Sequence, residues 1–432
     1  YNVRYFDEFI LNRGNPRLPY GESAFDDHYR TNRINNSMFL NGKVGDKQFI
    51  DLTASYSYYN RKKNKLFKDL ITLEENLTSD PADQDTSVFT TFMTRGTYSH
   101  DDVTDWLKFQ AGFDINLDYT ESDKIAEDAE SMQDFAFFTS LGLSVGDDFI
   151  FQPSLRYISN SQYEAPLIPS LNIKYNVNDY ITMRASYARG FRAPSLKELY
   201  FLFVDVNHNI QGNNNLDAET SHSYNLTATV NLQNDDYVFR IEPKAFYNNI
   251  TNLISLALVE DGLYSYVNIG DYKTMGVNLS LKYFRTNLSM TLGASYIGRR
   301  NKLNQDNEID VPEFDYAPEM QFNCMYTFTK SKVRLSAFYK YTGEISAHYI
   351  GLDDDGNDRL NQYIKGDYHI LDLSVSREFF DKLMDVSIGG KNLFDVKNIE
   401  TIYGASGAPS ETSGNRPVSF GRTAYVKIKF NF

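Results

Sequence analysis

The chain has 432 residues, with 43 Lys and Arg against 57 Asp and Glu, and its net charge of −14 argues against a nucleic-acid backbone as the main partner. The single cysteine, Cys324, excludes an internal disulfide framework and a cysteine-rich zinc site. No apolar run approaches the roughly 18 residues of a membrane-spanning helix. The 32 Tyr and 31 Phe against one Trp are a heavy aromatic load, and in membrane barrels such rings form belts at the two lipid interfaces.

Strands are predicted along the whole chain because apolar and polar residues alternate with a period of two. The alternation is clearest at 181–187, 277–283 and 426–432, where each segment has one apolar and one polar face. About 17 such strands are predicted, the first of them near 33–43. We expect residues 1–30, which precede this strand, to form an extracellular loop.

The connections between the predicted strands alternate in length. Short polar turns fall at 44–47, 146–148, 233–236 and 329–332, and long irregular segments at 61–86, 189–221, 299–317, 343–366 and 394–420. Loops this long are unusual in a compact soluble domain, whereas outer-membrane barrels have short periplasmic turns and long external loops. The sequence therefore predicts an all-β fold, a transmembrane antiparallel β-barrel, with a large soluble β-protein as the alternative.

Several motifs of the chain resemble those of TonB-dependent outer-membrane receptors, and they occur in the same order. They are GFRAP at 190–194, GNNNL at 212–216, FYNNI at 246–250, TMGV at 274–277 and NLFD at 392–395. The resemblance implies a 22-stranded barrel around an N-terminal plug. It also implies that residues 1–432 are a partial barrel, with the plug, about five strands and the segment that contacts TonB absent from this sequence. An odd strand count fits this expectation, because bacterial barrels have an even number of strands; a miscount by one is the other explanation.

The loop at 189–221 carries the residues that bear on the ligand. In the heme receptors of this family, a FRAP-like motif, a histidine and an NPNL-like motif follow one another here, and the histidine binds the heme iron. The matching residues are Phe191, Arg192, Ala193 and Pro194, then His208, then Asn213, Asn214, Asn215 and Leu216. The resemblance implies His208 as an axial ligand of heme iron, a role that suits a neutral imidazole. Asn214 replaces the usual proline, and the flanking motifs also occur in siderophore and corrinoid receptors, so only His208 points to heme.

Other residues are secondary candidates for ligand contact. An aromatic cluster in the same loop could supply the flat apolar surface that a porphyrin needs, namely Tyr200, Phe201 and Phe203. His348 lies in another long loop, and His222 is expected in the lumen or at the rim. Arg192 could instead pair with a carboxylate such as Glu198 while Pro194 ends the strand, so that these motif residues shape the loop without touching ligand.

Two charged runs remain open to more than one interpretation. The acidic run at 353–358 has its glycine at the wrong spacing for an EF-hand loop, so we expect a solvated loop. The basic run at 61–65 could meet lipopolysaccharide, an anionic substrate or only solvent.

The predicted function is active heme uptake, and hence iron acquisition, across the outer membrane of a Gram-negative bacterium. We expect no enzyme, because the chain has no Gly-rich phosphate loop, paired-carboxylate signature or nucleophile elbow. Heme would be cargo, with no intrinsic cofactor. The expected partners are the TonB–ExbB–ExbD complex, acting through the missing N-terminal region, a surface hemophore lipoprotein, and outer-membrane lipid and lipopolysaccharide, but no nucleic acid. The nearest alternative is a receptor for a ferric siderophore or a corrinoid; a porin, a barrel hydrolase and an adhesion barrel are more distant ones.

Overall fold

The structure is a computed structural model that describes all residues except 81–82, 126–128, 205–208, 261, 301–312, 353–357, 382, 404–413 and 432. The described part consists almost wholly of antiparallel strands and includes one short helix, α1 (Leu196–Tyr200). No helix in these ranges is long and apolar enough to cross a membrane.

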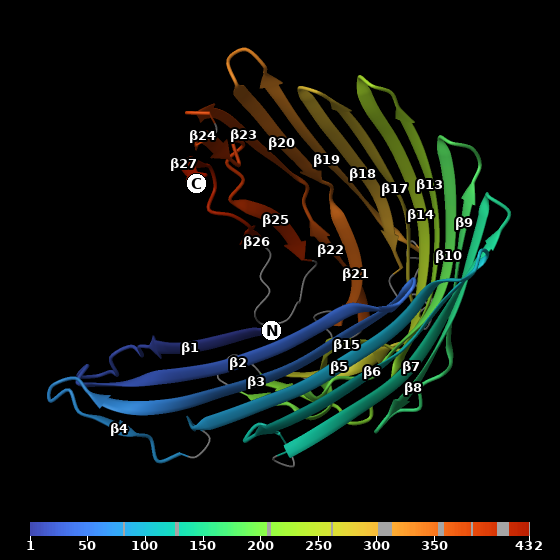
Figure 1. The fold of residues 1–432 in the computed structure, drawn as a ribbon. Helices are drawn as coiled ribbons and strands as arrows, with labels where there is room; N and C mark the ends of the chain where they lie inside the picture. Colours follow the sequence, from blue (N-terminus) through green and yellow to red (C-terminus); the bar gives the residue numbers. More distant parts are fainter. Residues whose placement is uncertain are drawn as a thin grey trace.

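One sheet of 19 strands forms the body of the molecule and curves into an open barrel, with β1 and β27 at its two edges (Figure 1). The short β4 (Glu75–Leu77) pairs with β3, and the other strands follow one another as antiparallel neighbours. They are β1 (Asn2–Asn12), β2 (Ser23–Gly45), β3 (Gln48–Asp69), β5 (Asp85–Thr104), β6 (Leu107–Ser122), β7 (Ala129–Val145), β8 (Phe149–Asn160), β9 (Ile168–Asn176), β10 (Ile181–Arg192), β13 (Glu219–Gln233), β14 (Tyr237–Thr251), β17 (Tyr272–Arg285), β18 (Leu288–Arg299), β19 (Asp315–Phe328), β20 (Val333–Thr342), β23 (Tyr368–Phe379), β24 (Met384–Lys391) and β27 (Thr423–Phe430). The predicted all-β antiparallel fold is confirmed, and from β2 onward the series matches the expected count of about 17 strands.

Connections of unequal length lie at the two ends of this sheet, as predicted. Short turns at one end include 46–47, 146–148, 234–236 and 329–332. The long connections at the other end contain more regular structure than expected, because they form two additional four-stranded sheets. One comprises β11 (Leu202–Val204), β12 (Asn209–Gln211), β15 (Leu253–Glu260) and β16 (Leu263–Ile269), and the other comprises β21 (Ile345–Leu352), β22 (Asp358–Lys365), β25 (Asn398–Tyr403) and β26 (Gly414–Pro417). Pairing in these sheets satisfies backbone groups that an irregular loop would leave to water.

Residues 1–30 also differ from the expected loop. β1 pairs with β2 along its whole length, from Asn2 opposite Ser37 to Asn12 opposite Asp27, and β2 begins at Ser23, ten residues before the predicted strand start. Polar residues occupy both faces of the upper part of β2, so the period-two signal that marks a half-buried strand is missing there. The backbone of Asn2–Asn12 is therefore a strand of the large sheet and not part of a loop.

The large sheet has one apolar and one polar face. In the lower half of β2 and β3 the even positions carry the exposed aliphatic side chains Met38, Leu40 and Ile50. The odd positions are mostly polar, as at Ser37 and Asp51, although Phe39 and Phe49 also lie on that face. A membrane barrel turns its apolar face outward and its polar face toward the lumen, so we call these the outer and inner faces. β2 and β3 have 23 and 22 residues, about twice the 9–11 that cross a membrane, and their upper halves therefore project beyond the apolar band.

Candidate functional site

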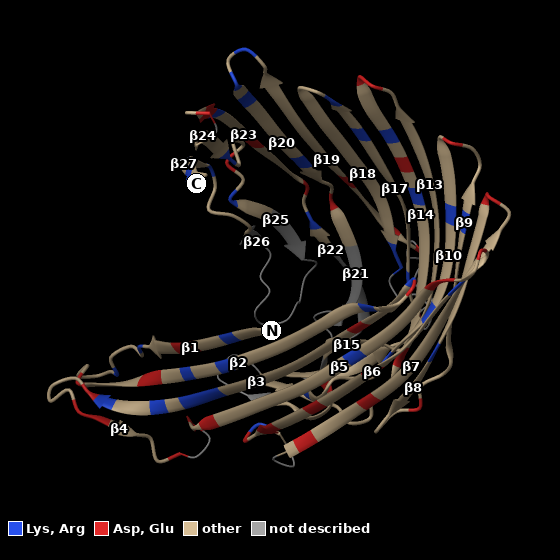
Figure 2. Cartoon of the chain, in the orientation of Figure 1, with Lys and Arg blue, Asp and Glu red and all other residues tan. Residues whose placement is uncertain are grey.

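The inner face of the upper β2–β3 hairpin combines cations with aromatic rings. The basic run at 61–65 lies within β3, so its odd members share the inner face with the odd members of β2. In the register, Tyr29 stands opposite Lys63 and Arg33 opposite Tyr59. Figure 2 shows the resulting blue bands toward the β4 end of β3. We call this group the inner cationic surface; it comprises Arg17, Arg33, Arg61, Lys63 and Lys65 with the rings of Phe25, Tyr29 and Tyr59.

Each cation of this surface lies over a ring. Arg61 Cζ is 4.7 Å and Lys63 Nζ is 5.9 Å from the centroid of Tyr29. The corresponding distances are 5.1 Å from Arg33 Cζ to Tyr59, and 4.8 Å and 5.5 Å from Arg17 Cζ and Lys65 Nζ to Phe25. Cations at these distances are attracted by the negative face of an aromatic ring, which holds their side chains in place at modest free-energy gain.

Two carboxylates partly neutralise the inner cationic surface. Lys63 Nζ lies 3.7 Å from Asp27 Oδ1, and Lys65 Nζ lies 2.9 Å from Asp83 Oδ1. The hydrogen bond to Asp83 raises the pKa of Lys65 against the opposing effect of burial. Asp80 lies close enough to Lys65 to help raise its pKa, and Asp85 stands opposite Lys63 but pairs with Lys124. The five cations still outnumber these carboxylates, although the whole chain has a net charge of −14. It is therefore suited to bind an anion, especially one that contains aromatic rings.

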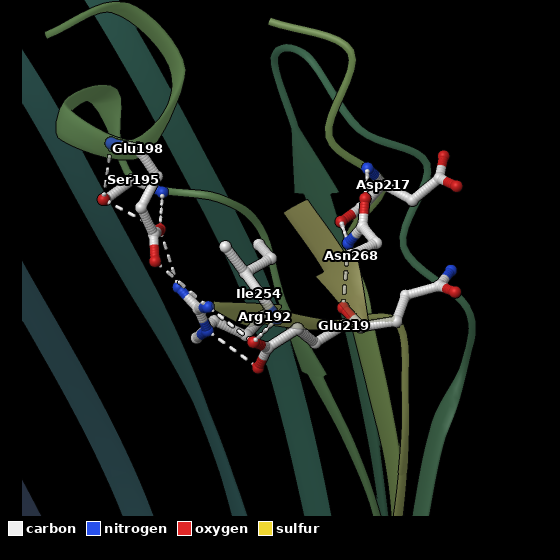
Figure 3. Close-up of polar contacts among 8 residues, drawn as sticks. Arg192, Ser195, Glu198, Asp217, Glu219, Ile254 and Asn268 are labelled. Carbon is white, nitrogen blue, oxygen red and sulfur yellow. Dashed lines mark hydrogen bonds and ion pairs between the residues drawn. The ribbon is translucent and has the colours of Figure 1, made fainter. Parts of the chain in front are cut away.

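Arg192 holds together the loop that follows β10. Its guanidinium binds two carboxylates, with Nη1 2.9 Å from Glu198 Oε2 and Nη2 2.6 Å from Glu219 Oε1 (Figure 3). A further bond of 2.8 Å joins Nε to Glu219 Oε2, so the contact with Glu219 is bidentate. Glu219 Oε1 also accepts a 2.8 Å hydrogen bond from the backbone N–H of Ile254 in the next long connection. The expected pairing of Arg192 with Glu198 is therefore present, and it extends to a second loop.

Helix α1 begins with a capping box that presents Glu198 to this arginine. Ser195 Oγ accepts a hydrogen bond from the backbone N–H of Glu198, and the Glu198 side chain accepts one from the backbone N–H of Ser195. Burial alone would raise the pKa of Glu198, but the hydrogen bonds from Arg192 and Ser195 lower it below its ordinary value. The hydrogen bond to Glu219, and after it the hydrogen bond to Glu198, raise the pKa of Arg192 against the opposing effect of burial.

A small hydrophobic core underlies the loop. Its buried members come from several strands and connections, and they are Met132, Leu196, Leu199, Leu216 and Ile254, with Tyr163, Ala193, Tyr200 and Tyr266 packed against them. Pro194 is almost completely buried. Ala193, Pro194 and Leu216 of the family motifs therefore contribute to packing of the loop.

The asparagine motif is also held by hydrogen bonds within the loops. Asn213 Nδ2 donates to the backbone oxygen of Tyr266 at 2.9 Å, and Asn213 Oδ1 accepts from the backbone N–H of Asn215. Asn268 accepts from the N–H of Asp217 at 2.8 Å and donates back to its carbonyl oxygen at 3.0 Å (Figure 3). At Gly212 a Cβ would lie 2.5 Å from the backbone oxygen of Leu199, so only glycine fits this close approach.

The structure describes the side chains of only some of the remaining predicted ligand contacts. Tyr200 is half-buried in the loop core and its hydroxyl lies 3.4 Å from Gln162 Oε1, and the Phe201 ring lies 5.9 Å from Lys197 Nζ. His208 lies outside the described residues, as does most of the acidic run at 353–358. Phe203 and His348 belong to β11 and β21, but their side chains are not among the described ones.

His222 is expected in the lumen or at the rim; it lies near the loop end of β13, at the rim, and on the outer face. It shares the outer face with Tyr224, and its Nδ1 lies 2.9 Å from the hydroxyl of Tyr187. The sequence does not predict the contact of Asn268 with Asp217 or the inner cationic surface, because each joins residues from different strands or loops. The one available signal for the surface was the run of charges at odd positions of 61–65.

Comparisons with known proteins agree with this geometry. The family model described as TonB dependent receptor-like, beta-barrel, matches residues 1–393. The chain is 23% identical over 311 residues to the hemoglobin and hemoglobin-haptoglobin-binding protein of Haemophilus ducreyi, covering 61% of this chain and 32% of that protein. It is also 23% identical over 381 residues to the vitamin B12 transporter BtuB of Photobacterium profundum, covering 87% of this chain and 56% of that protein. The chain thus spans about a third and about half of these two relatives.

Solved structures with a similar fold include two siderophore receptors. A point mutant of the ferric enterobactin receptor PfeA of Pseudomonas aeruginosa gives a TM-score of 0.63 at 16% identity and covers 100% of this chain and 70% of that one. The siderophore receptor PirA of Acinetobacter baumannii gives 0.64 at 15% identity, with coverage of 100% and 75%. At these identities the likeness concerns the fold alone.

Proposed function

The chain belongs to the TonB-dependent receptor-like β-barrel family, and from this premise we propose that it forms the barrel of a receptor that takes up heme. Proteins of this family are receptors, not enzymes, and lie in the outer membrane of Gram-negative bacteria. In the proposed function the external loops capture heme and the TonB–ExbB–ExbD complex supplies energy for its passage through an N-terminal plug. A surface hemophore lipoprotein that delivers the heme is part of the same proposal.

The inner cationic surface is the observation that carries this proposal. Heme is a flat aromatic ring system with two carboxylates, so it requires both cations and ring faces. Arg61 and Lys63 lie over Tyr29, and Arg33 lies over Tyr59, on the lumen side of the upper hairpin. A ligand entering from outside would meet this surface, where charge-assisted bonds to carboxylates are stronger than bonds between neutral groups.

His208 is the proposed iron ligand. Support comes from its position in the sequence, between the FRAP-like motif at 191–194 and the NNNL motif at 213–216. The loop core and the Arg192 contacts fix the two flanks of this segment. The motif residues hold the loop, and a histidine between the fixed flanks would be presented from it.

A ferric siderophore is the second candidate, and the charge of the inner cationic surface favours it. The surface has five cations, of which Lys63 and Lys65 form ion pairs with Asp27 and Asp83. Three cations then remain, which is more than two heme carboxylates need. A ferric complex of three catecholates has three negative charges and three aromatic rings. A corrinoid is less well matched, since its recognition does not call for so much positive charge.

Titrations of the purified receptor in detergent with hemin and with a ferric catecholate separate these ligands. Heme uptake predicts a Soret shift that His208→Ala abolishes and that His222→Ala, on the outer face, leaves intact. Binding of the ferric catecholate without any hemin signal would reject heme in favour of the second candidate. Lys63→Glu should weaken either ligand by roughly tenfold, equivalent to about 1.4 kcal/mol, whereas Lys62→Glu on the opposite face should not. Equal effects of the two lysine variants would remove the inner cationic surface as the binding surface.

A further inference from the structure

Three metal-ligating side chains converge on the outer face of the upper β2–β3 hairpin. Asp26, His28 and Glu75 each offer one ligand atom, and these atoms lie within 4.8 Å of one another. Asp26 and His28 are two residues apart on β2 and therefore share a face. Glu75 reaches them from β4, where it stands opposite Lys68 of β3, which in turn stands opposite Ala24 of β2. The pairing of three strands thus assembles the cluster.

One nitrogen atom of the cluster lacks a hydrogen-bond partner within the described part of the chain and is therefore free to bind a cation. Asp26 is 3% exposed; its Oδ1 accepts a 3.1 Å hydrogen bond from the N–H of Gly14, while its Oδ2 is 3.8 Å from Lys68 Nζ. His28 Nε2 is shielded from solvent and has no hydrogen-bond partner among the described residues. The His28 ring is held edge-on by Phe9, with centroids 5.2 Å apart. A shielded polar atom without a partner is costly unless an ion or water binds it.

Lys68 supplies positive charge to this cluster but leaves the imidazole unpaired. Its Nζ lies 2.6 Å from Glu75 Oε1, and this hydrogen bond lowers the pKa of Glu75. A metal ion can accept lone pairs from two carboxylates and an imidazole at once. The Lys68 ammonium contacts only the two carboxylates and leaves the imidazole without a partner in the described ranges.

We propose that Asp26, His28 and Glu75 bind a divalent transition metal ion, for which Zn²⁺ is the best match. Zinc accepts imidazole nitrogen and carboxylate oxygen and is stable with three protein ligands and one water, whereas Ca²⁺ and Mg²⁺ prefer oxygen ligands alone. Binding displaces the Lys68 ammonium from Glu75 and fastens β4 to β2. The site is separate from the inner cationic surface, which lies on the opposite face of the same strands, so it does not depend on the transported ligand.

Calorimetric titration of the chelator-washed receptor in detergent with zinc chloride tests this site, and the visible spectrum of bound Co²⁺ gives a second readout of the coordination. We expect His28→Ala and Glu75→Gln each to weaken zinc binding by about tenfold or more. Lys68→Met removes the competing ammonium and should strengthen binding. The matched control is Asp27→Asn, one residue along β2 on the opposite face, which should leave the affinity unchanged.

Two results would overturn the proposal. Equal zinc affinity in the wild type, His28→Ala and Glu75→Gln would place any bound zinc elsewhere. No binding by either the wild type or Lys68→Met at millimolar zinc would show that the cluster takes no metal. Glu75 is exposed, so its substitution keeps the test valid even if a change at His28 disturbs folding.

Discussion

Replacing Arg192 by alanine should loosen two of the long loops at once. The substitution leaves Glu198 and Glu219, whose side chains are 16% and 12% exposed, without their shared counter-charge. Removing one partner from a fully buried pair costs about 3–5 kcal/mol, while an exposed pair contributes about 0–1 kcal/mol. Because the Arg192 side chain is itself 43% exposed, solvent screens part of the effect, and we expect about 2 kcal/mol for this site.

Hydrogen exchange measured by mass spectrometry reports such local opening, because each loop opens with its own free energy. A loss of about 2 kcal/mol should speed exchange roughly thirtyfold in peptides from 193–204 and 209–218. The effect should extend to 252–260, since Glu219 also accepts the N–H of Ile254. Arg192→Lys keeps the positive charge but cannot form the bidentate contact of the planar guanidinium, so its exchange rates should lie between those of the wild type and of Arg192→Ala.

The control for this measurement is Arg184→Ala, an exposed arginine on the inner face of the same strand. It should leave exchange in both loops unchanged. Equal exchange in the Arg192→Ala and Arg184→Ala variants would refute the role assigned to the Arg192 contacts. Faster exchange confined to 193–218 would refute the coupling through Glu219.

Three more predictions concern the same loops. Glu198 has a lowered pKa in the folded protein, so its contribution to loop stability should be complete above its ordinary pKa of 4.5 and be lost as the pH falls through the lowered value; exchange corrected for intrinsic rates should show this in the wild type but not in Glu198→Gln. Gly212→Ala should destabilise the loop by about 1–3 kcal/mol, measured as faster exchange, while Gly42→Ala, where a Cβ meets nothing within 4 Å, should be silent there. Asn268→Ala removes the hydrogen bonds to Asp217 and should lower protection of 213–218 at a cost of about 1–2 kcal/mol; unchanged protection would show that these hydrogen bonds do not hold the loop.

The barrel could be predicted because a membrane strand has a strong period-two pattern. At 181–187 and 277–283 the apolar residues fall on one face, and these segments are strands in the structure. The pattern fails where both faces of a strand meet water. Asn2–Asn12 and the upper part of β2 are paired strands, but apolar and polar residues do not alternate in them. The two four-stranded sheets of the long connections could not be predicted from the sequence for the same reason.

The candidate sites were less predictable because they depend on which strands become neighbours. The pair of Arg192 with Glu198 is local, since the capping box at Ser195 places the carboxylate six residues from the arginine. The contacts of Glu219 with Ile254, and of Asn268 with Asp217, join residues far apart in the sequence. No local pattern reports such contacts.

The alternation of side chains between the two faces of β2 and β3 limits how this hairpin can change over evolutionary time. Inserting or deleting one residue in mid-strand would turn every later side chain to the opposite face, so the cations over Tyr29 would point outward and the apolar band inward. Insertions and deletions are therefore expected two residues at a time, or at places where the regular pairing of the strands is interrupted. The structure has one such place beside the short turn, where the register shifts between Lys43 and Gly45, and another at 70–74, before β4.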